Sequence, residues 1–511
     1  MQHFSERAEL KIKFLLMATT LAYWLWVLSP FYTIPSQDDG LNHLAYVDFL
    51  RRHGTWALGH VPYPHGNEFG AGHLVFYPVG MHAILAFVAS LLSWLGFEPD
   101  LALLLKITAA LFMSLIPVFL FSGIKKIEPK IDHRLALLTA ASLSLLQLFP
   151  AHAIGEGGLP RIMAQVLALP VAFAAIAGSL SKRRWVFCIT GVTPILFYIH
   201  PSSFFVLYPA LLLAGHLKTS RDWILSSGAA ILGAILCLLP MKTGEIHLSQ
   251  MGIGAGGMSL GWVAAVLDRF KGVFHFLFSD PHGLFKFMSV RSLLVYIGVI
   301  VLIIDGTKRR RLWTLASPFL ISLCMIAPWG WLQTPGGFFY QAVKRIAEVG
   351  LLPLAVCGAA GAAWLQRKSE NYTRSLGIVL GLLAVWTGVS VHRSRITVHQ
   401  MSKLFSTPRA EEATLLDQEL RDLPSGTVVV SDQQWFGMIR GLRPDLEFVG
   451  SDGECKFSKA PACIGRQSFI EAVKKAREEK TPIRSNHFAG KSLYFAERRT
   501  GSPFLSAIPR N

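Results

Sequence analysis

The chain has 511 residues, of which 52% are hydrophobic and only 16% carry a charge. A soluble domain usually carries about 25% charged residues, so this composition cannot supply polar surfaces for several soluble domains. It also excludes a disordered chain and a disulfide-dense secreted protein. The sequence therefore predicts an α-helical polytopic membrane protein. Lys and Arg number 49 against 32 Asp and Glu. We interpret this excess as basic cytoplasmic loops rather than as a nucleic-acid-binding surface.

Apolar runs of roughly 17 to 25 residues predict about eleven transmembrane helices. They lie at Ile12–Pro30, Leu101–Gly123, Leu135–Ala151, Arg161–Leu180, Trp185–Ile199, Ser203–His216, Trp223–Pro240, Val290–Ile304, Leu312–Pro328, Ile346–Leu365 and Leu376–Val391. A further apolar stretch, Tyr77–Gly96, is ambiguous. The first run lacks a small-residue cleavage site, so we expect an uncleaved anchor rather than a signal peptide.

The basic loops resolve the ambiguity of Tyr77–Gly96. The dense clusters of Lys and Arg lie near residues 125–134, 182–184, 218–221, 308–311 and 367–374. If the N-terminus is cytoplasmic and Tyr77–Gly96 does not cross, every cluster falls on the cytoplasmic side, as the positive-inside rule requires. If Tyr77–Gly96 crosses, all of them move outside. We therefore expect Tyr77–Gly96 to be an interfacial or re-entrant helix.

The chain divides into a transmembrane part, residues 1–391, and a more polar tail, residues 392–511. In the tail we expect helices at Glu411–Leu423 and Gln467–Arg477 and strands at Thr427–Ser431 and Leu493–Phe495, which suggests a small α/β domain. The topology places it outside the bacterial inner membrane, in the periplasm. Cys455 and Cys463 lie in this tail, where an oxidising compartment permits a disulfide.

The most informative polar segment follows the first span and contains Asp38, Asp39 and His43. Two adjacent carboxylates repel each other, so at least one tends to hold a proton longer or to bind a cation. If a helix starts near Gly40, His43 falls one turn from Asp39 and can face the same ligand. The alternative is that Asp39 simply caps an interfacial helix.

Two later outer segments also carry candidate binding groups. Glu156 and Arg161 lie in a Gly-rich loop, where Arg161 at a helix start could hold a phosphate; an ordinary loop explains the pattern equally well. His200 lies between two spans and is either a site group or a helix-turn residue.

Lys344 and Arg345 precede the tenth predicted span and break the positive-inside pattern at the outer face. Two cations in a disfavoured place suggest an anionic partner near the outer leaflet. Pairing of Lys344 with Glu348, one turn further on, is the competing explanation.

These features together resemble the GT-C glycosyltransferases, multi-span enzymes that use polyprenyl-phosphate-linked sugars. The resemblance rests on an acidic pair after the first span, an aromatic-Pro-x-Gly segment and a basic residue entering a late span. Residues Tyr77-Pro-Val-Gly80-Met-His82-Ala are similar to a Tyr-Pro-Pro-Gly-x-His-Ala stretch of uncharacterised bacterial members, with Val79 in place of the second proline.

The resemblance implies an inverting sugar transfer at the outer face, with Asp39 or Asp38 as the base toward the acceptor. It implies that Arg345, or failing that Arg161, holds the donor phosphate. Asp38 and Glu156 would be ligands if a divalent cation such as Mg or Mn is used, although Gly-Glu-Gly-Gly departs from the Asp-x-Asp pair of the metal-dependent branch.

The partners expected from this reading are the polyprenyl-phosphate sugar donor, a glycan, lipid or protein acceptor and the lipid bilayer, with no nucleic acid. A polysaccharide polymerase or ligase of the O-antigen-ligase type is the nearest alternative, since it also uses lipid-linked sugars. A secondary transporter is less favoured because the charges cluster at helix ends and no halves of the sequence match.

Overall fold

The computed structural model describes most of the predicted membrane region and parts of the tail. The described residues are 2–30, 33, 40, 43–44, 46–47, 50–51, 61–62, 74–75, 79–97, 99–145, 150–155, 157–200, 202–213, 220–243, 290–305, 307, 335–369, 373–405, 418–431, 446–448, 466–480, 492–496 and 505–507.

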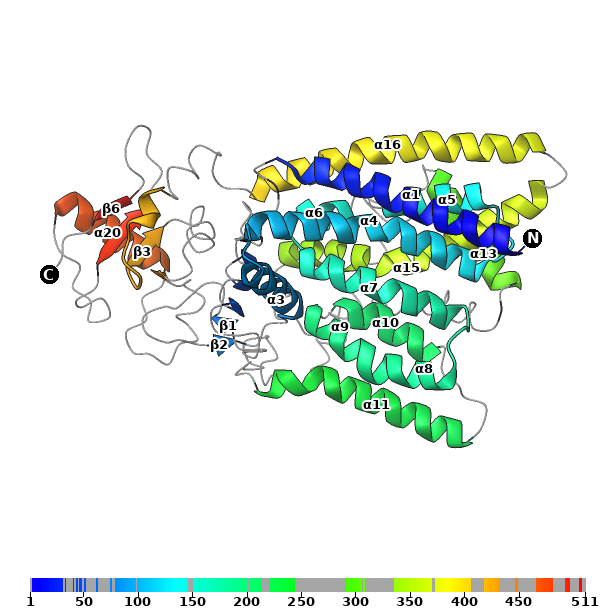
Figure 1. The fold of residues 1–511 in the computed structure, drawn as a ribbon, viewed down its shortest axis with the longest axis horizontal. Coiled ribbons are helices and arrows are strands. Elements are labelled where there is room, and N and C mark those ends of the chain that lie inside the picture. The colour runs from blue at the N-terminus through cyan, green and yellow to red at the C-terminus, as the bar shows by residue number, and fades with distance from the viewer. Residues whose placement is uncertain are drawn as a thin grey trace.

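The protein is mostly helical, and its long helices lie side by side in a bundle (Figure 1). The helices are α1 (Gln2–Leu28), α3 (Gly80–Trp94), α4 (Leu101–Ile127), α5 (His133–Ser144), α6 (His152–Gly155), α7 (Leu159–Ile176), α8 (Lys182–Phe187), the π-helical segment Cys188–Val192, α9 (Thr193–Ile199), α10 (Ser202–Leu213), α11 (Ser220–Thr243), α13 (Val290–Asp305), α15 (Pro335–Ser369) and α16 (Thr373–Phe405). In its described residues, each predicted span falls mainly on a helix or a run of helices; Leu312–Pro328 lies outside the described residues.

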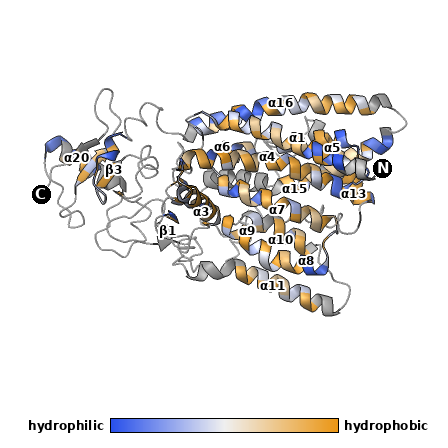
Figure 2. Cartoon of the chain, in the orientation of Figure 1, coloured by the Kyte–Doolittle hydropathy of each residue, from blue (hydrophilic) through white to orange (hydrophobic). Residues whose placement is uncertain are grey.

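Four helices in the described part of the chain are long and apolar enough to cross a membrane. They are Arg7–Leu28, Leu101–Ile127, Leu159–Ile176 and Leu376–Lys403. Hydrophobic residues cover the middle of the bundle helices (Figure 2), and large apolar side chains such as Phe14 and Ile224 point outward with 74% of their surface exposed. An apolar exterior of this kind requires lipid around it, so the fold is that of a membrane protein.

Helices α1 and α4 run antiparallel, and two hydrogen bonds fix their direction. In the middle, the Thr20 hydroxyl donates to the Ser114 carbonyl at 3.3 Å. At the far end, Lys106 Nζ donates to the Pro30 carbonyl at 2.9 Å. The first loop, from Phe31 to Pro99, therefore begins and ends at one end of the bundle, as expected for a Tyr77–Gly96 segment that does not cross.

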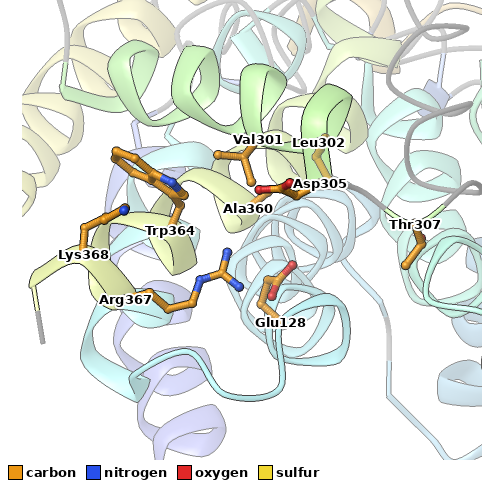
Figure 3. A pocket seen from close by; sticks show the side chains of 9 residues that line it. All are labelled: Glu128, Val301, Leu302, Asp305, Thr307, Ala360, Trp364, Arg367 and Lys368. Carbon is orange, nitrogen blue, oxygen red and sulfur yellow. The ribbon is translucent and has the colours of Figure 1, made fainter.

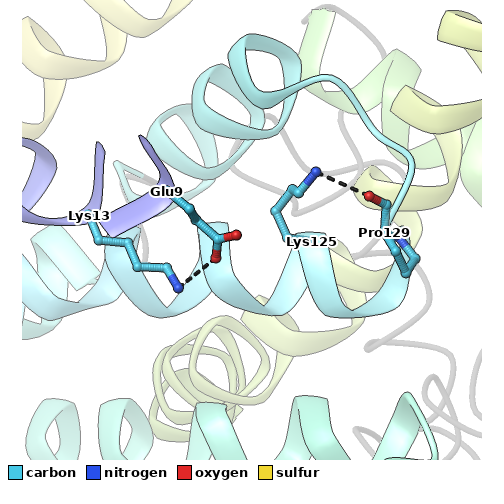
Figure 4. A network of polar contacts seen from close by, with 4 residues as sticks. All are labelled: Glu9, Lys13, Lys125 and Pro129. Carbon is cyan, nitrogen blue, oxygen red and sulfur yellow. Dashed lines mark hydrogen bonds and ion pairs between the residues drawn. The ribbon is translucent and has the colours of Figure 1, made fainter. Parts of the chain in front are cut away.

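We call the end that carries Pro30 and Lys106 the first-loop end, and the end that carries Lys125 and Arg367 the basic end. The N-terminus lies at the basic end, whereas α3 and α6 lie at the first-loop end (Figure 1). Near the start of α1, Lys13 Nζ lies 2.6 Å from a Glu9 carboxylate oxygen. Lys125 Nζ donates to the Pro129 carbonyl at 3.2 Å, which closes the turn after α4 (Figure 4).

Helix α16 runs parallel to α1 and ends at the first-loop end. The Tyr23 hydroxyl lies 2.9 Å from the Ser394 hydroxyl, and the Arg395 guanidinium lies 4.3 Å from the centre of the Trp26 ring. Further along, His399 Nε2 donates to the Val27 carbonyl at 2.9 Å. The tail therefore leaves the bundle at the same end as the first loop. The expected boundary at residues 391 and 392 lies inside this helix.

At the basic end, Gln366 connects α15 to the turn between α4 and α5. Its side-chain oxygen accepts from the Asp132 backbone N–H at 2.6 Å, and its side-chain nitrogen donates to the Lys130 carbonyl at 3.2 Å. Farther from this end, α13 and α15 approach so closely that a Cβ on Gly298 or Gly361 would overlap a backbone carbonyl of the other helix. Small residues at such crossings are typical of helices packed in membranes.

The described part of the tail contains a small mixed sheet in the order β4-β3-β5-β6. Strands β3 (Val428–Ser431), β4 (Glu447–Phe448) and β5 (Leu493–Ala496) pair in parallel, and β6 (Leu505–Ala507) is antiparallel to β5. Helix α20 (Arg466–Glu479) accompanies the sheet. A second, two-stranded antiparallel pairing joins β1 (Val61–Pro62) to β2 (Leu74–Val75) in the first loop.

Candidate functional site

The segment that follows the acidic pair is helical in its described residues and packs into the protein. Gly40, His43, Leu44, Tyr46, Val47, Leu50 and Arg51 have helical backbone. The spacing places His43, Val47 and Leu50 on one face, and all three are buried. The His43 side chain is only 5% exposed. We expect Asp39 and His43 to face one ligand if a helix starts near Gly40, and Gly40 has helical backbone.

His43 joins three segments that are far apart in the sequence. Its Nε2 lies 2.9 Å from the Gly157 carbonyl oxygen, and its Nδ1 lies 3.0 Å from Nε2 of His82 in α3. A carbonyl only accepts, so His43 Nε2 carries a hydrogen and donates. In neutral His43 the Nδ1 atom then accepts from the His82 Nε2–H. The two bonds form one directed chain from His82 through His43 to Gly157.

His82 is fully buried, with none of its surface exposed. Its ring meets the Tyr46 ring edge to face, with the centroids 5.3 Å apart. Burial, and secondarily the neighbouring His43, lower the pKa of His82 well below its ordinary value of 6.5. The neutral form of His82 is therefore the one that the site holds at neutral pH.

The turn before α7 brings Arg161 against the backbone that His43 contacts. Gly157 has a φ of +83°, in the left-handed region that glycine adopts without strain. A Cβ on Gly158 would lie 2.7 Å from Arg161 Nη2, so the guanidinium lies directly over this glycine. Arg161 is only 6% exposed. Gly158 is the N-cap of α7. The positive end of the dipole of α7 therefore lies beside the buried Arg161 guanidinium.

Two neighbouring contacts complete this end of the bundle. A Cβ on Gly80, the first residue of α3, would lie 2.9 Å from the Tyr198 carbonyl oxygen, so α3 starts against the end of α9. His200 is the C-cap residue of α9 and belongs to the same region. On the other side, a Cβ on Gly155 would lie 2.7 Å from the Met401 Cβ, so α16 covers α6.

The structure thus brings His43, Arg161 and His200 to one end of the bundle. Asp38, Asp39 and Glu156 lie outside the described residues. Lys344 and Arg345 lie within α15, of which only the backbone is described at these positions. Within the described ranges, no group of three or more His, Cys, Asp or Glu side chains is placed to hold a metal ion.

Two buried polar residues of this region were not among the predicted site residues. His82 is part of the Tyr77–Ala83 motif but was given no role there. Gln165, only 2% exposed, follows Arg161 by one turn of α7. Both are polar residues in otherwise apolar helices, and this pattern is visible in the sequence. Polar groups inside a membrane region are retained chiefly when they have partners or a function, so the pattern could have identified both residues.

The fold and site define a polytopic membrane protein with a buried His–His–Arg cluster at one end of its helical bundle. Residues 10–429 match the family of unknown function DUF6541, and the chain belongs to that family. No curated protein matches the chain.

Several solved structures align with this chain at low similarity. The archaeal oligosaccharyltransferase AglB from Archaeoglobus fulgidus, in complex with an inhibitory peptide and a dolichol-phosphate, aligns with a TM-score of 0.48 and 12% identity over 96% of this chain and 70% of its own. An Archaeoglobus fulgidus oligosaccharyltransferase with Zn and sulfate gives 0.41 and 12%, over 84% of this chain and 62% of its own. The mycobacterial arabinofuranosyltransferase AftD gives 0.35 and 14%, over 81% of this chain and 29% of its own. At this level of similarity the activity must be inferred from the chain's own residues.

Proposed function

We propose that this protein is a GT-C-type glycosyltransferase that moves a sugar from a polyprenyl-phosphate donor to an acceptor at the first-loop end of the bundle. The observation that carries the proposal is the double contact of His43 with His82 and with Gly157. It joins the segment after the acidic pair, the Tyr-Pro-x-Gly-x-His-Ala motif and the Gly-rich turn before Arg161. These are the segments on which the sequence resemblance and its site residues depend.

The acceptor side of the proposed reaction belongs to Asp39. Asp39 precedes the fixed His43 by four positions, so the two Cα atoms lie within about 14 Å of each other even if the chain is fully extended. Asp39 would accept the proton of the acceptor hydroxyl while the oxygen of that hydroxyl attacks the anomeric carbon of the donor sugar. General-base help of this kind contributes a rate factor of about 10² to 10⁴. Asp38 would assist, either in positioning or, together with Glu156, as a ligand if a divalent cation takes part.

The donor side requires cations beside the departing phosphate. As the new bond forms, the bond between the anomeric carbon and the phosphate oxygen breaks, and the phosphate leaves with that electron pair, which inverts the anomeric centre. We assign the phosphate to Arg345, with Arg161 next in line and with Lys344 and His200 as neighbouring binding groups. His43, whose two ring nitrogens are both hydrogen-bonded, would hold the first-loop segment beside them. Fixed cations at developing negative charge stabilise a transition state without reorganising.

The position of Arg345 along α15 supports this assignment. Arg345 lies twenty-two residues before Arg367, which corresponds to about 33 Å of α-helix, close to the hydrocarbon thickness of a bilayer of about 30 Å. Since Arg367 is at the basic end, Arg345 falls near the opposite membrane boundary. A polyprenyl chain remains in the bilayer, so its phosphate lies at such a boundary and meets Arg345 there.

The test is the binding of polyprenyl phosphate to the purified chain in lipid nanodiscs. Each charge-assisted hydrogen bond to a phosphate is worth about 1.5–3 kcal/mol, so Arg345→Ala should weaken binding about tenfold or more. Arg393→Ala is the matched control, because Arg393 is an exposed arginine of α16 outside the cluster. Equal affinities in the wild type, Arg345→Ala and Arg161→Ala would overturn the assignment of the donor to this end.

A further inference from the structure

A cavity of about 480 Å³ opens at the basic end of the bundle, away from the His43 cluster. Its charged lining comes from Glu128, Asp305, Arg367 and Lys368, and Trp364 adds an aromatic wall (Figure 3). The volume lies within the range of about 300–1,000 Å³ that is usual for small-molecule sites. Neither the sequence motifs nor the proposed transfer reaction uses this cavity.

The acidic part of the cavity lies where helices end. Glu128 is the C-cap residue of α4, and Asp305 is the last residue of α13. Helix α15 ends beside them. The carbonyl end of a helix carries a partial negative charge, so three such ends and two carboxylates favour a cation. This part of the cavity therefore favours a positively charged group.

The basic part of the cavity comes from the last turn of α15. Arg367 and Lys368 are both exposed, and Lys368 Nζ lies 6.0 Å from the centre of the Trp364 ring. Figure 3 shows the Arg367 guanidinium directed toward the carboxylates of Glu128 and Asp305. Among the described residues, however, Asp305, Arg367 and Lys368 form no ion pair with one another. Side chains of both signs of charge thus line one cavity.

We propose that this cavity binds the phosphoethanolamine headgroup of a membrane phospholipid. The ammonium group would donate hydrogen bonds to Asp305 and Glu128, and the phosphate would accept from Arg367 and Lys368. Trp and basic side chains are suited to the headgroup layer of a membrane. A purely anionic headgroup would leave its charge facing two carboxylates, and a quaternary choline headgroup cannot donate hydrogen bonds to them. The charge pattern therefore favours a primary amine carried on a phosphate.

The test is native mass spectrometry of the full purified chain, stripped of lipid and titrated separately with phosphatidylethanolamine, phosphatidylglycerol and phosphatidylcholine. We expect saturable binding that is tightest for phosphatidylethanolamine. Asp305→Asn and Arg367→Gln should each weaken that binding about threefold to tenfold, because they remove opposite halves of the recognition. Lys126→Gln, an exposed cation on α4 that does not line the cavity, should bind as the wild type does.

The comparison between lipids and variants decides the outcome. Asp305→Asn should also narrow the preference for phosphatidylethanolamine over phosphatidylglycerol, since the ammonium-binding carboxylate is lost. Equal or tighter binding of phosphatidylglycerol by the wild type, or wild-type binding by both cavity variants, would overturn the proposal. Soluble phosphoethanolamine is the remaining arm: displacement of the lipid at equal concentration would identify a free metabolite as the ligand and contradict the lipid assignment.

Discussion

The Nε2 atom of His43 lies 2.9 Å from the carbonyl oxygen of Gly157, a residue more than a hundred positions further along the chain. This bond holds the segment after the first span against the turn that starts α7. Because the second nitrogen of His43 bonds His82, rotation of either ring breaks a contact to a distant segment. Side-chain contacts between segments that are far apart in the sequence therefore hold the first-loop end together.

Stability should fall as the pH decreases below about 6.5, and His82 should be the main cause. The pKa of buried His82 is lowered well below its ordinary value of 6.5. Below pH 6.5 the unfolded chain binds a proton at this residue and the folded chain does not, so the folded state loses up to about 1.4 kcal/mol per pH unit until the folded pKa is reached. The thermal midpoint in detergent, measured from pH 8 to pH 5, should decline.

His82→Gln should flatten that decline, because the amide keeps a donor and removes the titrating group. His392→Gln is the control, since His392 is exposed on α16 and should keep the wild-type profile. A wild-type slope in His82→Gln would assign the pH dependence to other groups.

Gly158→Ala should displace Arg161 and destabilise the protein. The new methyl group would lie 2.7 Å from Arg161 Nη2 and 2.9 Å from the Ala153 carbonyl oxygen, closer than carbon atoms normally approach. Overpacking of this kind costs about 1–3 kcal/mol. Gly388→Ala is a matched control because a Cβ at Gly388 meets nothing within 4 Å. The free energy of unfolding in detergent would be measured for the wild type and for both variants. A Gly158→Ala variant as stable as the wild type would contradict the packing of Arg161 over Gly158.

The tail should be accessible from outside the cell, since α16 ends at the same bundle end as the first loop. A membrane-impermeant thiol reagent applied to intact spheroplasts, after reduction, should label Cys455 and Cys463. Cys188 and Cys357 are internal controls, because they are only 7% and 5% exposed and should stay unlabelled. Labelling of the tail only after lysis would reverse the orientation.

Arg345→Ala should reduce donor use more than Arg345→Lys. A guanidinium can make two parallel hydrogen bonds to a phosphate, which an ammonium group cannot reproduce. The loss should appear in a titration of the donor at fixed acceptor. If the cations of this segment instead pair with Glu348, Glu348→Gln should impair the enzyme as much as Arg345→Ala. The phosphate would then be assigned to Arg161.

Much of the helical framework could be predicted from the sequence, because each long apolar run has one stable solution in a membrane. The positions of α1, α4 and α13 agree with the runs that predicted them. Helix ends were less predictable: the predicted span Ile346–Leu365 is the middle of the longer helix α15, because its flanking polar residues continue the helical backbone. In the tail, β3 and β5 were predicted, whereas the two-residue strand β4 carries too short a pattern to detect.

The candidate site was predictable only in part. His43 and Arg161 stood out as polar residues beside Gly-rich or acidic segments, but their proximity depends on how α3 and α7 pack. His82 could not be assigned a role from spacing, because its partner His43 is far away in the sequence and belongs to another helical segment. Contacts of this kind arise from tertiary packing, which a single sequence does not display.

The most direct test of the account is the consumption of polyprenyl-phosphate-linked sugars by the purified chain in vesicles, with a cell-envelope extract as the source of acceptor. Release of free polyprenyl phosphate would be followed for the wild type, Asp39→Asn and Asp38→Asn. We predict release by the wild type, a loss of about a hundredfold or more in Asp39→Asn, as for removal of a general base, and a milder loss in Asp38→Asn. Equal release by the wild type and a folded Asp39→Asn variant would contradict the account and leave Asp39 as the cap of an interfacial helix.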